Sequence, residues 1–167
     1  VTARDALYFM IAQALLASVI LFQFNRFTVW ACVASLGLVA IYPFMKRITW
    51  WPQAWLGLTF NWGALLGFAA ASGQLGLPAL LLYASGVFRT LGYDTIYALQ
   101  DIEDDAMVGV KSSARRLGTN VQFGVGVFYG ITVILTVAAG LSAGLGPLFY
   151  VALLPFAAHL LRQARDV

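Results

Sequence analysis

The 167-residue chain contains very little charge. Only 10% of its residues are Asp, Glu, Lys or Arg, whereas 61% are hydrophobic. Soluble domains carry about 25% charged residues, so this composition excludes an ordinary soluble domain. Four stretches lack charged residues altogether: 6–25, 27–45, 48–88 and 117–161. The first two can each supply one membrane-crossing helix of about 20 residues, and the last two can each supply about two. We therefore expect an integral membrane protein in a lipid bilayer.

Cysteine and the common catalytic motifs are also scarce. Cys32 is the only cysteine, which excludes a disulfide within the chain. The sequence has no Walker loop, no Gly-x-Ser-x-Gly, no His-Glu-x-x-His and no paired-cysteine metal motif. The net charge of +3 does not indicate a nucleic-acid partner, because the basic residues lie between apolar spans. That distribution is typical of membrane orientation signals.

The apolar pattern predicts an all-α fold, a single multi-span transmembrane helical bundle. Six spans are expected, at residues 5–22, 28–44, 53–71, 77–99, 121–141 and 146–162, with Gly- and Pro-containing turns between them. Six spans leave only Arg26 on one face. The other face receives Arg4, Lys46, Arg47, Lys111, Arg115, Arg116, Arg162 and Arg165. Positive residues favour the cytoplasmic or matrix side, so loops 45–52 and 100–120 are expected there.

The few acidic residues are concentrated in one segment. Of seven Asp and Glu residues, five lie between positions 94 and 105: Asp94, Asp101, Glu103, Asp104 and Asp105. On one continuous helix, 100° per residue would place Asp94, Asp101 and Asp105 in a single stripe over about three turns. The Asp101-x-x-x-Asp105 pair can bind Mg²⁺ together with waters and substrate phosphates. The alternative is an exposed acidic helix end that only keeps a loop soluble. Asp94 favours the metal site, because a carboxylate inside an apolar span usually faces a water-filled cavity.

Basic residues near these acids suggest an anionic ligand. Lys111 follows Asp105 by six residues and can reach the same cavity, where an ammonium group would neutralise a diphosphate. Lys46 and Arg47 lie on the same face, and an Arg side chain can bind a carboxylate or phosphate bidentately. Both sites are also explained as orientation signals. Arg89 lies within a span, and we expect it to line a cavity or pair with an acid on a neighbouring helix.

Two motifs resemble those of a known family. The segment Tyr93-Asp94-Thr95-Ile96-Tyr97-Ala98, followed by Asp101-x-x-Asp104-Asp105 and Gly109-x-Lys111-Ser112, resembles the second aspartate-rich motif of the intramembrane aromatic prenyltransferases. Tyr42-Pro43-Phe44-Met45-Lys46-Arg47 is similar to a signature of the members that act on 4-hydroxybenzoate. The resemblance implies a bundle of about nine helices around a central cavity, of which this chain would supply about six. The family's first motif, Asn-Asp-x-x-Asp-x-x-x-Asp, is not in the chain, so we expect the 167 residues alone to be inactive.

The resemblance also implies a reaction and roles for individual residues. The complete enzyme would transfer a polyprenyl group from polyprenyl diphosphate to 4-hydroxybenzoate, at the ring carbon ortho to the hydroxyl, with Mg²⁺ as cofactor, in ubiquinone biosynthesis. Asp94 is the candidate base, and Arg47 is the candidate partner of the benzoate carboxylate or of the diphosphate. The implied set comprises the metal ligands Asp101, Asp104 and Asp105, the catalytic residues Asp94 and Lys111, and the substrate-binding residues Lys46, Arg47, Tyr93, Tyr97 and Lys111.

Two alternatives and two locations remain open at this stage. A sister prenyltransferase would act on another aromatic acceptor. A divalent-ion transporter would use the same acids to bind a translocated ion, which predicts acids near the membrane midplane that are accessible from both faces. In this chain the acids lie at one end of a span and continue into a basic loop, which fits diphosphate better. The expected location is the bacterial inner membrane, with the mitochondrial inner membrane as the alternative and the active face toward the cytoplasm or matrix.

Overall fold

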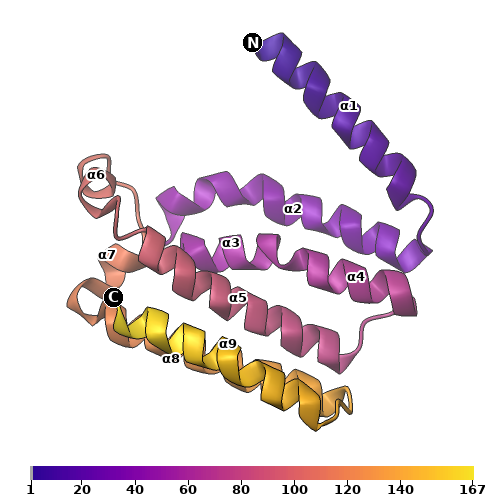
Figure 1. The fold of residues 1–167 in the computed structure, drawn as a ribbon. Helices are drawn as coiled ribbons and strands as arrows, with labels where there is room; N and C mark the ends of the chain where they lie inside the picture. The colour runs from indigo at the N-terminus through magenta and orange to yellow at the C-terminus, as the bar shows by residue number, and fades with distance from the viewer. Residues whose placement is uncertain (1) are drawn as a thin grey trace.

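A computed structural model describes residues 2–167 as a series of helices (Figure 1). They are α1 (Ala3–Leu21), α2 (Arg26–Ile48), α3 (Pro52–Phe60), α4 (Trp62–Ser72), α5 (Leu77–Tyr97), α6 (Ile102–Met107), α7 (Ser113–Leu117), α8 (Val121–Ser142) and α9 (Pro147–Arg165), with a 3-10 turn at Gly118–Asn120. This described range contains no strand. The predicted all-α fold is confirmed.

Four helical segments are long and apolar enough to cross a membrane: α1, α2, Pro52–Ser72 and Ser113–Ser142. Helices α5 and α9, of 21 and 19 residues, are comparable in length but carry charged side chains. Both pack against α8. Each expected span corresponds to a helical segment, and the third is divided into α3 and α4 at Asn61.

Local sequence signals fix several helix ends. Thr2 and Asp5 form a reciprocal capping box at the start of α1. The side chain of Asn25 accepts the Thr28 amide at the start of α2. Pro occupies the first turn of α3, α5 and α9, where its missing amide hydrogen costs no helical bond. Gly73 ends α4 with φ +74°, a left-handed conformation that suits glycine.

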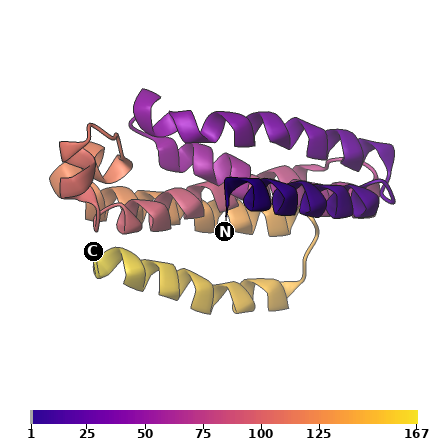
Figure 2. The ribbon, with the colours of Figure 1, turned by 90° about the horizontal axis from the view of Figure 1, so that it is seen from above.

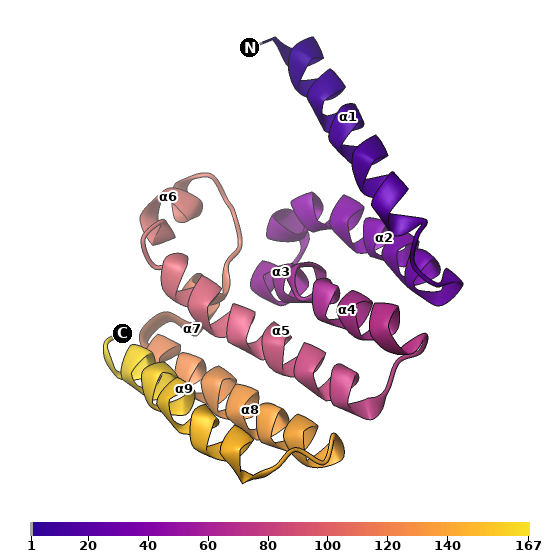
Figure 3. The ribbon, with the colours of Figure 1, turned by 45° about the vertical axis from the view of Figure 1, so that its right-hand side comes forward.

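The helices lie side by side in chain order. The main contacts join α2 to α3 and α4, these two to α5, α5 to α8, and α8 to α9. Figures 2 and 3 show this succession from two further directions. Helix α1 diverges from the others, and none of its residues is buried. The short helices α6 and α7 both lie at the end of the bundle where α5 terminates (Figure 1).

Polar side chains connect neighbouring helices. Asn61 at the α3–α4 break donates to the Gly57 carbonyl at 2.9 Å and to Thr90 Oγ1 of α5 at 2.8 Å. Ser85 Oγ of α5 donates to the Thr132 carbonyl of α8 at 2.9 Å. Such bonds hold helices together in lipid, where apolar side chains gain little by leaving the hydrocarbon.

Glycine permits the closest approach between α5 and α8. A Cβ atom at Gly92 would lie 2.3 Å from Cε1 of Tyr129, so the aromatic ring occupies the space that a side chain would need. The Gly-x-x-x-Gly spacing at Gly126 and Gly130 also suits a close helix contact. In the structure, however, an added Cβ at either position meets nothing within 4 Å. The buried core continues from Tyr129 to Leu160 and Ala164 of α9.

Candidate active site

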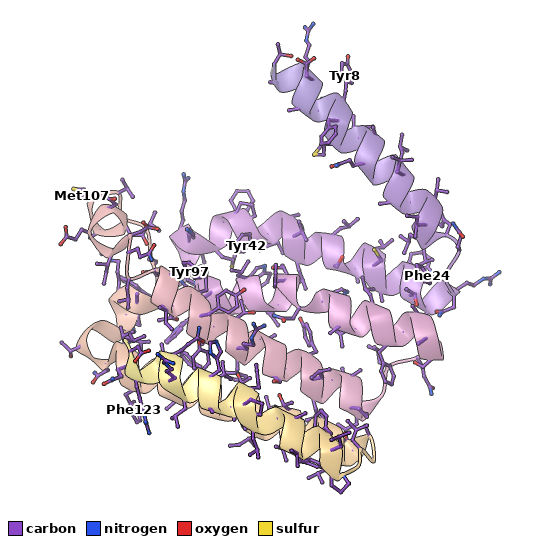
Figure 4. The ribbon with its side chains drawn as sticks, in the orientation of Figure 1. Tyr8, Phe24, Tyr42, Tyr97, Met107 and Phe123 are labelled. Carbon is purple, nitrogen blue, oxygen red and sulfur yellow. The ribbon has the colours of Figure 1, made fainter. Side chains whose placement is uncertain are left out.

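A polar pocket of about 150 Å³ lies at the end of the bundle where α2, α3, α5 and the α6–α7 region meet. Its walls come from distant parts of the sequence and include Tyr42, Lys46, Gln53, Asp94, Tyr97, Asp101, Asp105 and Ser112. Figure 4 shows Tyr42 and Tyr97 near this end of the bundle. Three carboxylates and one ammonium group therefore share one small pocket.

The three carboxylates are carried by two helices and the turn between them, not by the single helix that the periodicity predicts. Helix α5 ends at Tyr97, and a new helix, α6, begins at Ile102. The expectation of one continuous helix from Asp94 to Asp105 is therefore wrong. Carboxylates are unfavourable at the negative C-terminal end of a helix and favourable at an N-terminus. The break places Glu103, Asp104 and Asp105 in the first turn of α6.

Asp101 and Asp105 remain close after this break, because the Asp105 amide donates to the Asp101 carbonyl at 2.8 Å. Both side chains line the pocket, whereas Asp104 is exposed and belongs to no part of its lining. Within residues 2–167, no three His, Cys, Asp or Glu side chains are arranged to hold a metal by themselves. Two carboxylate donors fit Mg²⁺, which commonly takes one or two carboxylates and fills its other positions with water and phosphate oxygens.

Lys46 and Lys111 are both predicted to bind substrate, but they lie in different surroundings. Lys46 lines the pocket with the acids. The amide of Lys111 donates to the Lys46 carbonyl at 3.0 Å, while its Nζ donates to the Ile48 carbonyl at 3.2 Å and lies 5.9 Å from the centre of the Trp50 ring. Lys111 thus stabilises the C-terminal end of α2, where a cation is favourable. A direct role of Lys111 at the diphosphate stays a prediction.

Of the other predicted binding residues, Arg47, Tyr93 and Tyr97, only Tyr97 lines the polar pocket. Arg47 is exposed and does not line this pocket. Tyr97 lines the polar pocket and also a second one between α5 and α9, to which Tyr93 contributes. The rings of Tyr93 and Tyr97 pack edge to face, with centroids 6.4 Å apart, which lies within the range of about 4.5–7 Å that is usual for such pairs.

Sequence reasoning missed a buried hydrogen-bond network beneath the pocket. Gln53 is only 4% exposed, and its Oε1 accepts the Ser113 amide at 3.1 Å. The hydroxyls of Ser113 and Thr95 share a hydrogen bond of 2.6 Å. This network joins α3, α5 and the start of α7, so it positions the chain that carries Asp105 and Ser112. The available signal was a Gln within the uncharged stretch 48–88, where a polar side chain needs a partner.

Arg115 is a second residue whose role the sequence did not reveal. Its place among the basic residues of one face predicts only an orientation signal. In the structure its Nη1 donates to the carbonyls of Val110 and Asp105, and its guanidinium lies 5.5 Å from the centre of the Trp50 ring. Arg115 therefore stabilises the segment between α6 and α7, because it binds the carbonyl of Asp105 in α6 and that of Val110 within the segment.

Replacing Gln53 by Leu is expected to loosen this loop. The change leaves the buried Ser113 amide without its acceptor, which should lower the free energy of unfolding by about 1–3 kcal/mol. Thermal melting in detergent and limited proteolysis at residues 98–112 would measure the effect. Gln74→Leu is the matched control, because Gln74 is exposed in the loop before α5. Equal melting temperatures for both variants would contradict the assigned role.

The sequence is similar to known proteins along its whole length. The sequence profile of the UbiA prenyltransferase family matches residues 1–167. Three similar proteins are each named "4-hydroxybenzoate polyprenyltransferase, mitochondrial". The Drosophila melanogaster protein is 45% identical over 160 residues, covering 95% of this chain and 41% of that protein. The Arabidopsis thaliana protein is 47% identical over 153 residues, covering 91% and 38%.

The human protein is 41% identical over 169 residues, covering 98% of this chain and 44% of that protein. The chain therefore spans less than half the length of these curated relatives. Comparison with the solved structures gives no match. The match along the whole chain, together with the helical bundle and its acidic pocket, shows that the chain belongs to the UbiA prenyltransferase family.

Proposed function

We propose that the complete protein transfers a polyprenyl group from polyprenyl diphosphate to the ring carbon ortho to the hydroxyl of 4-hydroxybenzoate, in ubiquinone biosynthesis. The observation that carries this proposal is the pocket that joins Asp94, Asp101 and Asp105 to Lys46 at one end of an apolar bundle. The names of relatives that are 40–47% identical support the same reaction.

The diphosphate end of the donor would bind in the polar pocket. Asp101 and Asp105 would hold Mg²⁺, which supplies positive charge to bind the diphosphate and stabilise it as it departs. Lys46 lines the same pocket and would neutralise part of the remaining negative charge. Arg47, one residue further along α2, is a candidate partner of the diphosphate or of the acceptor's carboxylate.

Asp94 is the candidate base for the acceptor. The allylic carbon–oxygen bond breaks with its electron pair going to the diphosphate, and the ring carbon ortho to the phenol forms the new bond to the allylic carbon. Ionisation of the phenol would assist this attack. The proton on the attacked ring carbon must then leave to restore the aromatic ring, and an ionised phenol regains its proton, so that one proton is released overall. Asp94 lines this pocket from α5, three residues before the helix ends at Tyr97, and this position supports its assignment as the proton acceptor.

The architecture suits one substrate dissolved in lipid and another in water. The apolar helices would let the polyprenyl chain extend into lipid, while the water-soluble acid would enter from the end of the bundle that carries the polar pocket. The complete protein would reside in an inner membrane, mitochondrial or bacterial, with the pocket toward the matrix or cytoplasm. The mitochondrial names of the relatives favour the first of these compartments.

The proposed function can be tested with membranes that contain the complete protein. Transfer of a polyprenyl group to labelled 4-hydroxybenzoate should occur with Mg²⁺ and stop when the divalent ion is removed by a chelator. Membranes without the protein are the control. Product formation from a different aromatic acceptor, with none from 4-hydroxybenzoate, would identify a sister prenyltransferase. Divalent-ion uptake into vesicles without any prenyl transfer would support the transporter instead, although the acids line a pocket at one end of the bundle.

A further inference from the structure

A second polar pocket, of about 390 Å³, lies between α5 and α9, and Tyr129 of α8 also lines it. Arg89, Tyr93, Tyr129, Phe156 and Gln163 form much of its wall, and Tyr97 lines both this pocket and the one that holds the acids. The two pockets therefore share Tyr97 in their walls and both lie against α5. The roles proposed above give no ligand to this second pocket.

Arg89 is the unusual member of this pocket. It lies eight residues before the end of α5 at Tyr97, a helical distance of about 12 Å. Its guanidinium lies 5.8 Å from the centre of the Tyr93 ring, and no carboxylate within residues 2–167 is in ion-pair distance of it. A cation at this depth in a membrane bundle is costly unless it meets an anion or water. The expected ion pair with an acid on a neighbouring helix is therefore absent from the described part of the chain, whereas the expected cavity is present.

The remaining walls suit an aromatic ring. Tyr93, Tyr97, Tyr129 and Phe156 supply four aromatic side chains around the pocket. The hydroxyl of Tyr129 donates to Gln163 Oε1 at 3.2 Å, which fixes the Gln163 amide and leaves its N–H groups as donors. A planar guanidinium binds a carboxylate through two parallel hydrogen bonds, while aromatic rings pack edge to face against another ring.

A diphosphate fits this second pocket less well than an aromatic acid does. The paired carboxylates that would hold it through a metal ion, and Lys46, all line the first pocket. Arg47, the other candidate for the carboxylate, is exposed and outside both pockets. We propose that Arg89 binds the carboxylate of the aromatic acceptor in the second pocket, so that the acceptor's ring lies beside Tyr97 and faces the acidic pocket. This inference rests on the proposed function and adds the acceptor's binding site to it.

Equilibrium binding tests the inference without requiring turnover. The complete protein in detergent, its Arg89→Gln and Arg89→Lys variants, and Arg162→Gln as control would be titrated with 4-hydroxybenzoate and with its neutral analogue 4-hydroxybenzamide. Arg162 is exposed and pairs with Asp166 at 3.7 Å on α9, so it matches Arg89 in charge but not in position. Arg89→Gln should weaken binding of the acid by about tenfold or more and leave the amide within about twofold, since only the acid meets the guanidinium. Arg89→Lys should fall between the two, because it keeps the charge but loses the bidentate geometry.

Three outcomes would overturn the assignment. These are unchanged binding of the acid to Arg89→Gln, an equal loss for the acid and the amide, and a raised KM for polyprenyl diphosphate with unchanged acceptor binding. The last result would assign Arg89 to the donor. Gel filtration monitors folding, and Arg89→Lys carries the test if Arg89→Gln does not fold. A wild-type protein that binds the acid through Arg89 but forms no prenylated product would contradict the proposed function and leave this inference intact.

Discussion

Asp101→Asn in the complete protein is expected to reduce the rate of prenyl transfer by about 100-fold or more. Asp101 lines the acidic pocket and is one of the two carboxylates available there for Mg²⁺. An amide cannot supply the negative charge that a divalent ion needs, and loss of one preorganised charge at a transition state costs roughly 10²–10³ in rate. Initial rates over a range of Mg²⁺ concentrations would also show a higher half-saturating concentration of the ion.

Substitutions at Asp105 and Asp104 test whether the loss of rate is specific to the carboxylates that line the pocket. Asp105→Asn should be as damaging as Asp101→Asn, because both carboxylates line the same pocket. Asp104→Asn is the matched control. Asp104 lies next to Asp105 on α6 but is exposed and outside the pocket lining. The sequence resemblance gave Asp104 a place among the metal ligands, and its position in the structure argues against that role. A loss for Asp104→Asn equal to that for Asp105→Asn would restore Asp104 to the set and contradict the geometry.

Gly92→Ala should clearly lower the stability of the bundle. The new Cβ would lie 2.3 Å from Tyr129 Cε1, and the Tyr129 ring is 3% exposed and held by its hydrogen bond to Gln163. Overpacking of this kind costs about 1–3 kcal/mol, more than the 0.5–1 kcal/mol that Ala gains over Gly within a helix. The measurement is the melting temperature of the complete protein in detergent.

Gly126→Ala is the control for that substitution. It makes the same chemical change on α8, where the added Cβ meets nothing within 4 Å of it. The control should therefore melt at the same temperature as the wild type or slightly above it. Because Asp94 follows Gly92 by two residues, Gly92→Ala should also reduce prenyl transfer in the fraction that remains folded. A variant that matches Gly126→Ala in both measurements would show that α5 and α8 are not in close contact at this point.

Composition was sufficient to predict the class of fold and the end of the bundle that carries the site. Long uncharged stretches specify helices in lipid whatever their neighbours are, so the spans could be located from hydropathy alone. The cluster of acids identified Asp94, Asp101 and Asp105, and these three side chains do line one pocket. Hydropathy did not reveal the interruption at Asn61, since a single polar residue hardly changes the average over a span.

The details of the site depend on contacts between distant residues, which periodicity does not contain. The helical projection assumed a continuous helix past Tyr97, whereas the acids are better accommodated at the start of α6. The direction of Lys111 depends on the Ile48 carbonyl, 63 residues earlier in the chain. Gln53 became recognisable as part of the site only when its bond to Ser113 was seen, because the two lie 60 residues apart.

The side-by-side order of the helices has a consequence for biosynthesis. Since each long helix after α2 packs against a helix that precedes it in the chain, a newly inserted span finds a partner already in the membrane. Such local pairing limits the time during which polar groups like Ser85 and Asn61 remain without partners in lipid. The acidic pocket is different, because the Lys111 amide must return to the Lys46 carbonyl at the end of α2. Assembly of the bundle can thus proceed helix by helix as the chain leaves the ribosome, while closure of the pocket has to await the α6–α7 segment.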